Sequence, residues 1–400
     1  MIKEIGMKKM KLFLLIVLIV MLSVQSAMAI PAFARRYKYS CTTCHDPFPR
    51  LKDYGDEFAG NGFIEPEEER DRDYVTAGDD KLWLNRDFPL AVRFDVYGLA
   101  ETGGDVKLDL QTPYGVKLLT GGTLYKNIGY YMYFYLFERG EIAGLEDAYI
   151  HFDNVFKSNL DILVGQFQTC DPLMKRELRL TYEDYHAYKV KIGDSNINLA
   201  YDRGLAFAYG IDKTGTDIIA TVTTGNGIPE AGIDKRFDAD PYKNFMLRVA
   251  QGIGEHISIG GFYYRGKEDK VVDEVLTPGL SNTVTYWGPD VVLSLGKFVL
   301  TGQYLQRYDS DPLFTGGTFS PVTTHGIVGE LVFAPKYDRS NTYWTLLYNR
   351  IDSDLPTYDY HTIAFSGTYL MARNLRLIGE YIYDIENPNH MFILGLTSAF

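Results

Sequence analysis

From residue 88 to the C-terminus the chain divides into segments of about ten residues in which apolar and polar side chains alternate. This period of two is typical of outer-membrane strands, which have one face toward lipid and the other toward the lumen. In the last segment Phe392, Leu394 and Leu396 share one face, while Thr397 lies on the other. We expect the apolar face to contact lipid.

The alternation predicts an all-β transmembrane barrel over residues 86–400, with about 16 antiparallel strands, because single-chain bacterial barrels have an even number. The predicted strands are 90–97, 115–123, 127–138, 144–152, 159–168, 205–211, 216–224, 244–252, 256–266, 283–295, 298–308, 323–334, 341–351, 359–370, 375–384 and 391–400. Short links alternate with long ones, as periplasmic turns alternate with outer loops. A soluble β-sandwich, the alternative, would have fewer strands and no terminal phenylalanine. The longest link, residues 169–204, takes the third outer position, and such a loop can fold into the lumen.

The N-terminus carries the features of an export signal. Lys3, Lys8, Lys9 and Lys11 precede the apolar run "LFLLIVLIVMLSV", and "AMA" at 27–29 fits the small-x-small rule for signal peptidase. The alternative is an uncleaved anchor, but the run is short of the roughly 20 residues that span a bilayer. We therefore expect a cleaved signal peptide at residues 1–29, and location in the bacterial outer membrane.

Charge and cysteine content narrow the class of partner. The formal net charge is −12, and removal of four lysines and Glu4 with the signal (+3) would leave the mature chain near −15. Nucleic acid and anionic lipid are poor partners for such a chain, whereas cations are better ones. Two of the three cysteines lie in one short motif, which excludes a disulfide framework and leaves Cys170 without an obvious partner.

That motif is Cys41-Thr-Thr-Cys44-His45, the CxxCH pattern of c-type haem attachment. In such sites two thiols form thioether bonds to the haem vinyl groups, and the adjoining imidazole binds the iron. Cys41 and Cys44 are therefore the predicted attachment points of one covalent haem c, and His45 is the predicted proximal ligand. A redox dithiol or half a zinc site would also contain CxxC, but the histidine and the export signal weigh against both.

The haem segment, residues 30–85, is close to the lower size limit for an independent core. It includes the acidic run "EPEEERDRD", which could concentrate ferrous ions but is more typical of a solvated linker. Arg35 and Arg36 are candidates for contact with the haem propionates, although the sequence is equally compatible with two solvent-exposed basic residues.

The same segment contains no methionine and no second histidine that could bind the iron opposite His45. Either the iron is five-coordinate or the barrel supplies the distal ligand. Parity along the predicted strands places two histidines inward near the periplasmic end, and two further candidates lie in the long third loop. The distal candidates are His151, His256, His186 and Met174, each of which could equally be an ordinary lumen or loop residue.

The stretch "IPAFARRYKYSCTTCHDPFPRLKDYGDEFAGNGF" resembles the N-terminal signature of fused outer-membrane monohaem cytochrome–porins, the type associated with oxidation of extracellular ferrous iron. The matching elements are Pro31, Phe33-Ala34-Arg35, the CxxCH motif, Phe48-Pro49-Arg50-Leu51, Gly55 and Asn61-Gly62-Phe63. The resemblance covers about 35 residues and implies a single haem in or against the lumen of a barrel of about sixteen strands.

Two functions are compatible with this sequence. The first is an electron conduit between an extracellular donor or acceptor, with ferrous iron as one candidate, and periplasmic c-type cytochromes or other carriers. The second is a diffusion porin with a haem-bearing N-terminal appendage. The fusion itself favours the conduit, because an appendage too small to fold alone needs the barrel as its scaffold. The donor does not follow from the signature; extracellular iron(II) oxidation would be the activity if ferrous iron is the donor.

Overall fold

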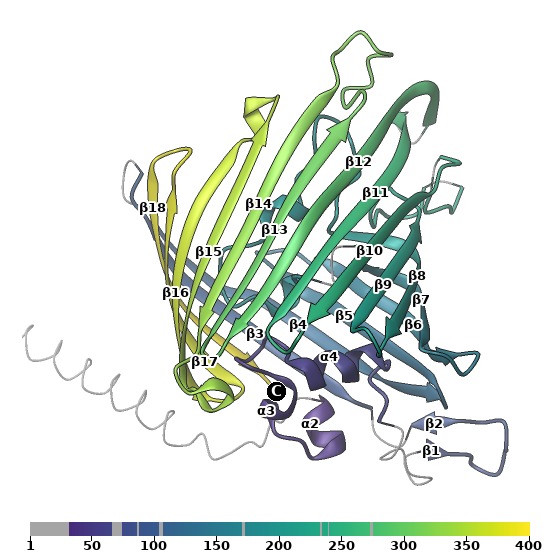
Figure 1. The fold of residues 1–400 in the computed structure, drawn as a ribbon, viewed down its shortest axis with the longest axis vertical. Coiled ribbons are helices and arrows are strands. Elements are labelled where there is room, and N and C mark those ends of the chain that lie inside the picture. The colour runs from purple at the N-terminus through teal and green to yellow at the C-terminus, as the bar shows by residue number, and fades with distance from the viewer. Residues whose placement is uncertain are drawn as a thin grey trace, which may run out of the picture.

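The computed structural model describes residues 32–65, 74–85, 88–103, 107–169, 173–232, 234–238, 240–272 and 275–400 (Figure 1). The predicted signal peptide, nearly all of the acidic run, and Cys170 lie outside these described residues. No helix among the described residues is both long enough and apolar enough to cross a membrane.

A closed barrel of sixteen antiparallel strands forms the body of the molecule. Each strand pairs with its neighbours in sequence, and β18 pairs with β3 to close the ring. The closing strands also pair through Val92 and Phe400, whose backbones exchange hydrogen bonds. The strands are β3 (Leu90–Glu101), β4 (Lys107–Tyr125), β5 (Ile128–Glu138), β6 (Gly144–Val155), β7 (Leu160–Gln168), β8 (Tyr201–Ile211), β9 (Thr216–Thr223), β10 (Asn244–Ile253), β11 (Ile257–Val272), β12 (Val275–Leu295), β13 (Phe298–Asp309), β14 (Val322–Phe333), β15 (Thr342–Ser353), β16 (Tyr360–Ala372), β17 (Leu375–Asp384) and β18 (Asn389–Ala399).

All sixteen predicted strands are present, and three are much longer than predicted. β4 begins at Lys107 rather than at residue 115. The strand continues past Pro113 because the pairing of β3 with β4 shifts register between Asp95 and Tyr97, and a proline is tolerated at such an irregularity. β11 and β12 extend until only residues 273–274 separate them, and a register shift after Asp269 absorbs the stretch around Pro278. The link over residues 267–282 that the predicted strand ends imply is wrong, because the polar residues on both sides continue the pairing while residues 278–280 are passed over at the register shift.

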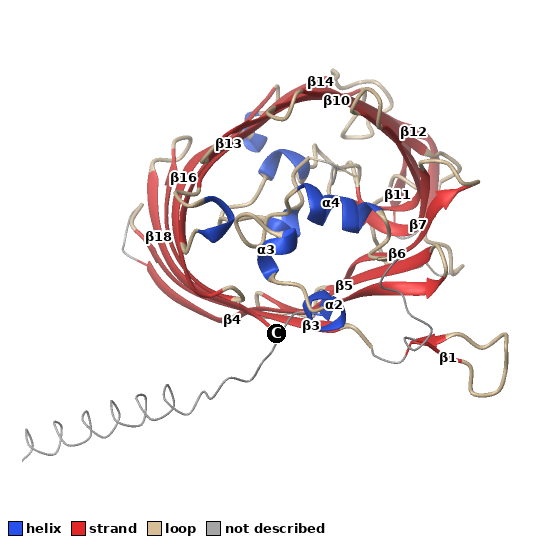
Figure 2. Cartoon of the chain, turned by 60° about the horizontal axis from the view of Figure 1, so that its bottom comes forward, coloured by secondary structure: helices blue, strands red, loops and turns tan. Residues whose placement is uncertain are grey.

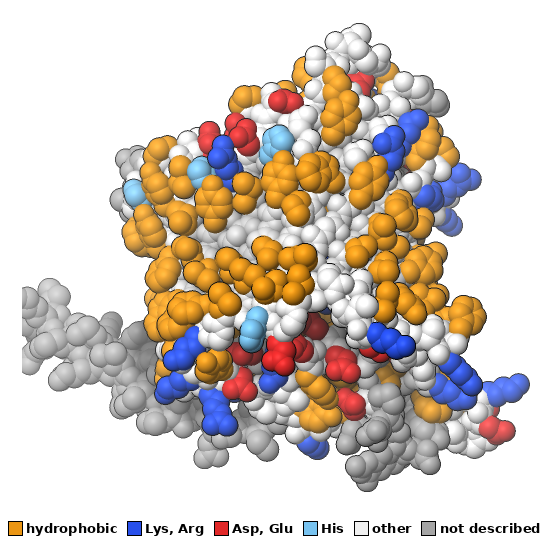
Figure 3. Space-filling model, in the orientation of Figure 1, with side chains coloured by type: hydrophobic (Ala, Val, Ile, Leu, Met, Phe, Trp, Pro, Cys, Tyr) orange, Lys and Arg blue, Asp and Glu red, His pale blue; other side chains and the backbone are white. Residues whose placement is uncertain are grey.

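Alternate side chains face opposite sides of the wall, as predicted. Phe392 and Leu394 are exposed on the outside, whereas Thr397 is buried on the inside. Hydrophobic side chains gather across the middle of the outer wall, and charged ones lie toward its two ends (Figure 3). This distribution is the one expected of a wall that faces lipid.

Most links alternate between short and long as predicted, with the β11–β12 link as an exception, and they define two ends of the barrel, a short-turn end and a long-loop end. The short-turn end also holds the beginning of β3 and the C-terminus (Figure 1). Two short 3₁₀ helices lie in links, η4 (Tyr337–Arg339) at the short-turn end and η5 (Pro356–Tyr358) at the long-loop end.

The N-terminal segment lies at the short-turn end. It contains α2 (Ala32–Tyr37), α3 (Cys41–Cys44) and α4 (Asp53–Gly60), followed by the small hairpin of β1 (Tyr74–Val75) and β2 (Leu84–Asn85). Seen from this end, α3 and α4 lie within the ring of strands, and α2 lies near its edge beside β3 (Figure 2). The segment therefore packs into the barrel mouth.

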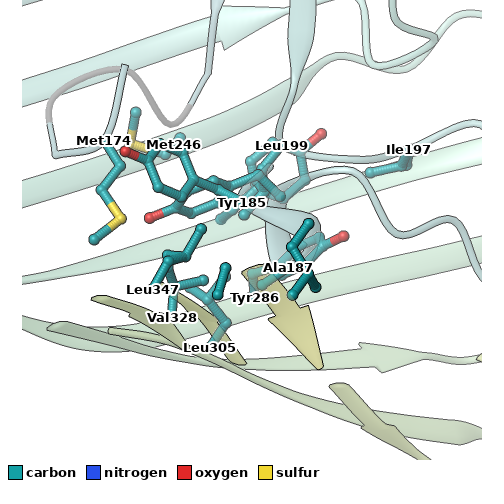
Figure 4. Packing of buried hydrophobic residues seen from close by; sticks show 14 of the residues in the cluster. Met174, Tyr185, Ala187, Ile197, Leu199, Met246, Tyr286, Leu305, Val328 and Leu347 are labelled. Atoms are coloured by element: carbon teal, nitrogen blue, oxygen red, sulfur yellow. The ribbon is translucent and has the colours of Figure 1, made fainter. Parts of the chain in front are cut away.

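The long link between β7 and β8, here called the third loop (residues 169–200), folds into the lumen as predicted. It contains η2 (Arg176–Leu178) and η3 (His186–Tyr188). Its apolar residues, including Tyr185, Ile197 and Leu199, form one hydrophobic cluster with inward side chains of β3, β4 and β10 to β18 (Figure 4). The loop is thus held against most of the circumference of the lumen.

Candidate functional site

The CxxCH motif forms a single helical turn. Ser40 caps α3, because its side chain accepts a hydrogen bond from the backbone N–H of Thr42 at 3.4 Å. Residues three apart on a helix lie on the same side, so the turn brings together the side chains of Cys41 and Cys44. Both thiols are free, and burial raises the pKa of each. The pair is therefore held close together in the thiol form.

His45 follows this turn and has a defined orientation. Its Nδ1 lies 3.3 Å from the carbonyl oxygen of Arg50. Because a carbonyl only accepts, Nδ1 carries the proton and Nε2 keeps its lone pair, the arrangement found in metal-bound histidines. Burial lowers the pKa of His45 to about 4, so the ring is neutral at neutral pH. The ring also packs edge-on against Phe48, with centroids 4.9 Å apart.

A glycine allows α4 to pack directly against the motif. A Cβ at Gly55 would overlap the carbonyl oxygen of Cys44 and would lie 3.0 Å from the side chain of Leu51. Only glycine fits at this approach of two backbones. Behind it, Phe33 stacks on Phe63 at 5.0 Å, and Phe63 stacks on Tyr131 of β5 at 4.8 Å. This aromatic stack connects the small N-terminal core to the barrel wall.

Polar contacts fix the motif to the opposite wall. Arg50 forms an ion pair with Glu330 of β14 at 3.2 Å and donates to the hydroxyl of Thr301 of β13 at 2.8 Å. Tyr343 of β15 donates to the carbonyl oxygen of Phe48 at 2.7 Å. The N-terminal segment is thus attached to both sides of the barrel.

A cavity of about 220 Å³ lies between the motif and the barrel. Cys41, Cys44 and His45 line it from one side, and inward side chains of β3, β4, β5 and β6 line it from the other. The third loop contributes Lys175 and two neighbours. The lining is mainly apolar, and its barrel and loop residues include Ala91, Val92, Arg93, Lys117, Leu119, Tyr131, Tyr133, Asp147, Tyr149, Lys175, Glu177 and Leu178.

Three positively charged residues of this lining, Arg93, Lys117 and Lys175, were not predicted as site residues from the sequence. Parity on β3 and β4 could have shown that the first two face the lumen, since Arg93 shares a face with buried Asp95 and Tyr97. The predicted propionate contacts lie elsewhere. Arg35 donates to the carbonyl oxygen of Leu90 and Arg36 lies 5.5 Å from the ring centroid of Tyr37, and neither lines the cavity.

The barrel histidines proposed as distal ligands also lie outside the lining. His151 faces inward, as predicted, and is buried. It packs behind the segment, where a Cβ at Gly62 would lie 3.2 Å from the imidazole, and its Nε2 is 3.9 Å from Asp161. His256 was expected to point inward, and this is wrong, because it lies exposed in the turn between β10 and β11.

The two loop candidates pack elsewhere in the lumen. His186 lies against the ring of Tyr360, with centroids 4.1 Å apart, and its Nε2 is 3.6 Å from Glu183. Met174 is buried in the hydrophobic cluster of the third loop. No group of three histidine, cysteine or acidic side chains suited to a metal ion exists among the described residues. A covalently attached haem does not require one, because the porphyrin supplies four of the iron ligands.

Comparisons with known proteins identify the fold. Neither a protein-family model nor a curated protein matches the chain. Solved outer-membrane proteins are similar: the anion-selective porin from Comamonas acidovorans (TM-score 0.56, 11% identity, 78% of this chain and 100% of that one) and OmpT of Vibrio cholerae in its trimer form (0.54, 11%, 78% and 99%). The channel DcaP of Acinetobacter baumannii is a third (0.51, 12%, 78% and 97%). The chain has the closed-barrel fold of porins.

Proposed function

We propose that the protein is an outer-membrane electron conduit of the fused monohaem cytochrome–porin type. Haem c would be bound covalently to Cys41 and Cys44, with His45 as the proximal ligand. One observation carries the proposal: a single cavity is lined both by the CxxCH motif and by inward side chains of β3 to β6. A cofactor attached to the motif would therefore lie in the barrel mouth.

The residues of the cavity fit a haem. Its walls are mainly apolar, which suits a porphyrin. The neutral ring of His45 has Nε2 available. Arg93, Lys117 and Lys175 offer cations to two propionate groups. When bound, the haem supplies a one-electron couple, and the chain positions it and shields it from water.

The orientation of the barrel indicates which redox partner each end would meet. Short turns of such barrels face the periplasm, so the cavity would open toward periplasmic c-type cytochromes or other electron carriers. The long loops would meet an extracellular redox partner, of which ferrous iron is one candidate. Iron(II) oxidation at the cell surface would then be the reaction served.

A diffusion porin is the alternative, and the porin fold of the barrel favours it. Such a protein needs a water-filled lumen. Here the third loop joins a hydrophobic cluster that includes Met246 of β10, Leu305 of β13 and Leu347 of β15 (Figure 4). Apolar side chains packed across a lumen oppose solute diffusion, which supports the conduit.

Liposomes provide the test. Purified protein is reconstituted around a trapped redox dye, and a membrane-impermeant reductant is added outside. We expect the dye to be reduced only by haem-loaded protein, and we expect the Cys41→Ala/Cys44→Ala double variant to be inactive. Equal dye reduction by both proteins, or large ion conductance without dye reduction, would contradict the conduit and favour the porin.

A further inference from the structure

The position of the cavity raises a problem for any conduit. It lies at the short-turn end, while an external redox partner would meet the long-loop end, and the third loop packs inside the lumen. Electron tunnelling falls off steeply with distance, and aromatic side chains divide a long gap into shorter ones. Aromatic residues that extend through the lumen would therefore connect the two ends.

The connection begins at the cavity wall on β5. Tyr133 lines the cavity, and its ring meets that of Tyr135 edge to face, with centroids 5.4 Å apart. Both rings are 3% exposed. Centroid separations of 4.5–7 Å are those of directly contacting aromatic pairs. Because residues i and i+2 of a strand share a face, this step leads along the wall toward the long-loop end.

Charged side chains connect Tyr135 to β3. Arg93 of β3 is in register with Lys117 of β4, which is in register with Tyr135, so the three residues form one row across the wall. Lys117 Nζ lies 4.3 Å from the ring centroid of Tyr135 and 3.5 Å from Asp95 Oδ2 of β3. Tyr97 follows Asp95 on the same buried face of β3, nearer the long-loop end.

Three tyrosines in mutual contact complete the connection. Tyr97 of β3 lies 4.9 Å from Tyr114 of β4, and both lie near Tyr182 of the third loop, with centroids 5.0 and 5.6 Å away. Arg139, in the link after β5 at the long-loop end, donates to the hydroxyl of Tyr114 at 2.7 Å. Tyr182 is only half-buried. The group therefore reaches the long-loop side of the lumen.

We propose that Tyr133, Tyr135, Tyr97, Tyr114 and Tyr182, here called the tyrosine path, carry electrons between the cavity and the long-loop end. This inference rests on the proposed function. In the donor direction one electron leaves an external one-electron reductant, such as a ferrous ion, which becomes ferric, and the ferric haem iron becomes ferrous. The tyrosines mediate the transfer and end in their starting state, so no proton is gained or lost.

The test uses haem-loaded full-length protein in liposomes of defined orientation, with the haem spectrum as the readout. The haem is reduced by a membrane-impermeant reductant placed on the long-loop side and, separately, on the short-turn side. The variants are Tyr97→Leu, Tyr135→Leu and Tyr182→Leu, and the last changes a half-buried loop residue rather than the wall. Tyr264→Leu is the control, because Tyr264 is a buried lumen tyrosine of β11 outside the path.

We expect each path variant to slow reduction from the long-loop side several-fold and to leave the short-turn rate and the haem spectrum unchanged. Tyr97→Phe should retain most of the rate, since the ring remains. Wild-type rates from the long-loop side in all three leucine variants would overturn the path. Slowing from both sides, or equal slowing in Tyr264→Leu, would assign the effect to structure and also overturn it. Wild-type protein that is reduced only from the short-turn side would instead refute the conduit itself.

Discussion

Arg50, five residues beyond His45, forms an ion pair with Glu330 of β14 at 3.2 Å. The same carboxylate accepts a hydrogen bond from Tyr185 of the third loop at 2.9 Å. Glu330 thus joins three parts of the molecule that are distant in sequence. These are the N-terminal segment, the barrel wall and the third loop.

Removing the charge of Glu330 should therefore loosen the N-terminal segment. In Glu330→Gln, the Arg50 guanidinium would lose its ionic partner in a largely buried site, and we expect docking to weaken by about 1–3 kcal/mol. The measurement is the rate of proteolysis within residues 32–65 in the folded barrel. Arg350→Gln is the matched control, because its pair with Asp352 is solvent-exposed and should contribute only about 0–1 kcal/mol. Equal proteolysis rates in the two variants would contradict this role of Glu330.

Two glycines of α4 should respond oppositely to a methyl group. Gly55→Ala would force α4 away from the Cys44 carbonyl, at a cost of about 1–3 kcal/mol, and lower the haem content per barrel. Gly60→Ala meets no atom within 4 Å, and alanine is the better helix former, so haem content should be unchanged. Haem absorbance per mole of protein measures both. Full haem content in Gly55→Ala would show that close packing of α4 is dispensable.

Haem attachment at the CxxCH motif and assembly of the barrel should be independent of each other. We expect Cys41→Ala or Cys44→Ala to abolish covalent haem attachment without preventing assembly, since strand pairing involves neither residue. A haem-stained band on a denaturing gel, compared with heat-dependent mobility of the barrel, measures the two properties. A stained band from the double variant would refute attachment at these cysteines.

Phe400 should matter for assembly. Its ring is partly exposed directly after β18, and its backbone exchanges hydrogen bonds with Val92 where the barrel closes. Loss of this aromatic ring would weaken the closure of the barrel in lipid, so Phe400→Ser should reduce membrane levels several-fold. Phe400→Tyr keeps the ring and should assemble normally. Immunoblots of membrane fractions compare them, and wild-type levels of the serine variant would contradict this role of Phe400.

Local pattern was sufficient to predict most of the barrel. Side chains of a strand alternate strictly between lipid and lumen, so the sequence identified all sixteen strands, their faces and the inward direction of His151. Reliance on local pattern also explains why the ends of β4, β11 and β12 were predicted wrongly. Pro113 and the stretch around Pro278 do not look like strands, yet long paired strands include them through register shifts.

The CxxCH motif likewise identified the residues of the candidate attachment site, because its chemistry depends on spacing within five consecutive residues. The surroundings of the motif depended on contacts between distant parts of the chain. Arg93, Lys117 and Lys175 reach the cavity from three different elements, and no local pattern distinguishes them from other lumen or loop cations.

Tertiary structure alone decided which inward residues come together. Parity states that a side chain faces the lumen, but height along the barrel and the path of the third loop determine its neighbours. For this reason His151 lies behind Gly62, outside the cavity, and Tyr182 of the loop meets Tyr97 and Tyr114 of the wall. Periodicity is a property of one strand, whereas a site inside a barrel depends on the relative positions of many strands and of the loop packed between them.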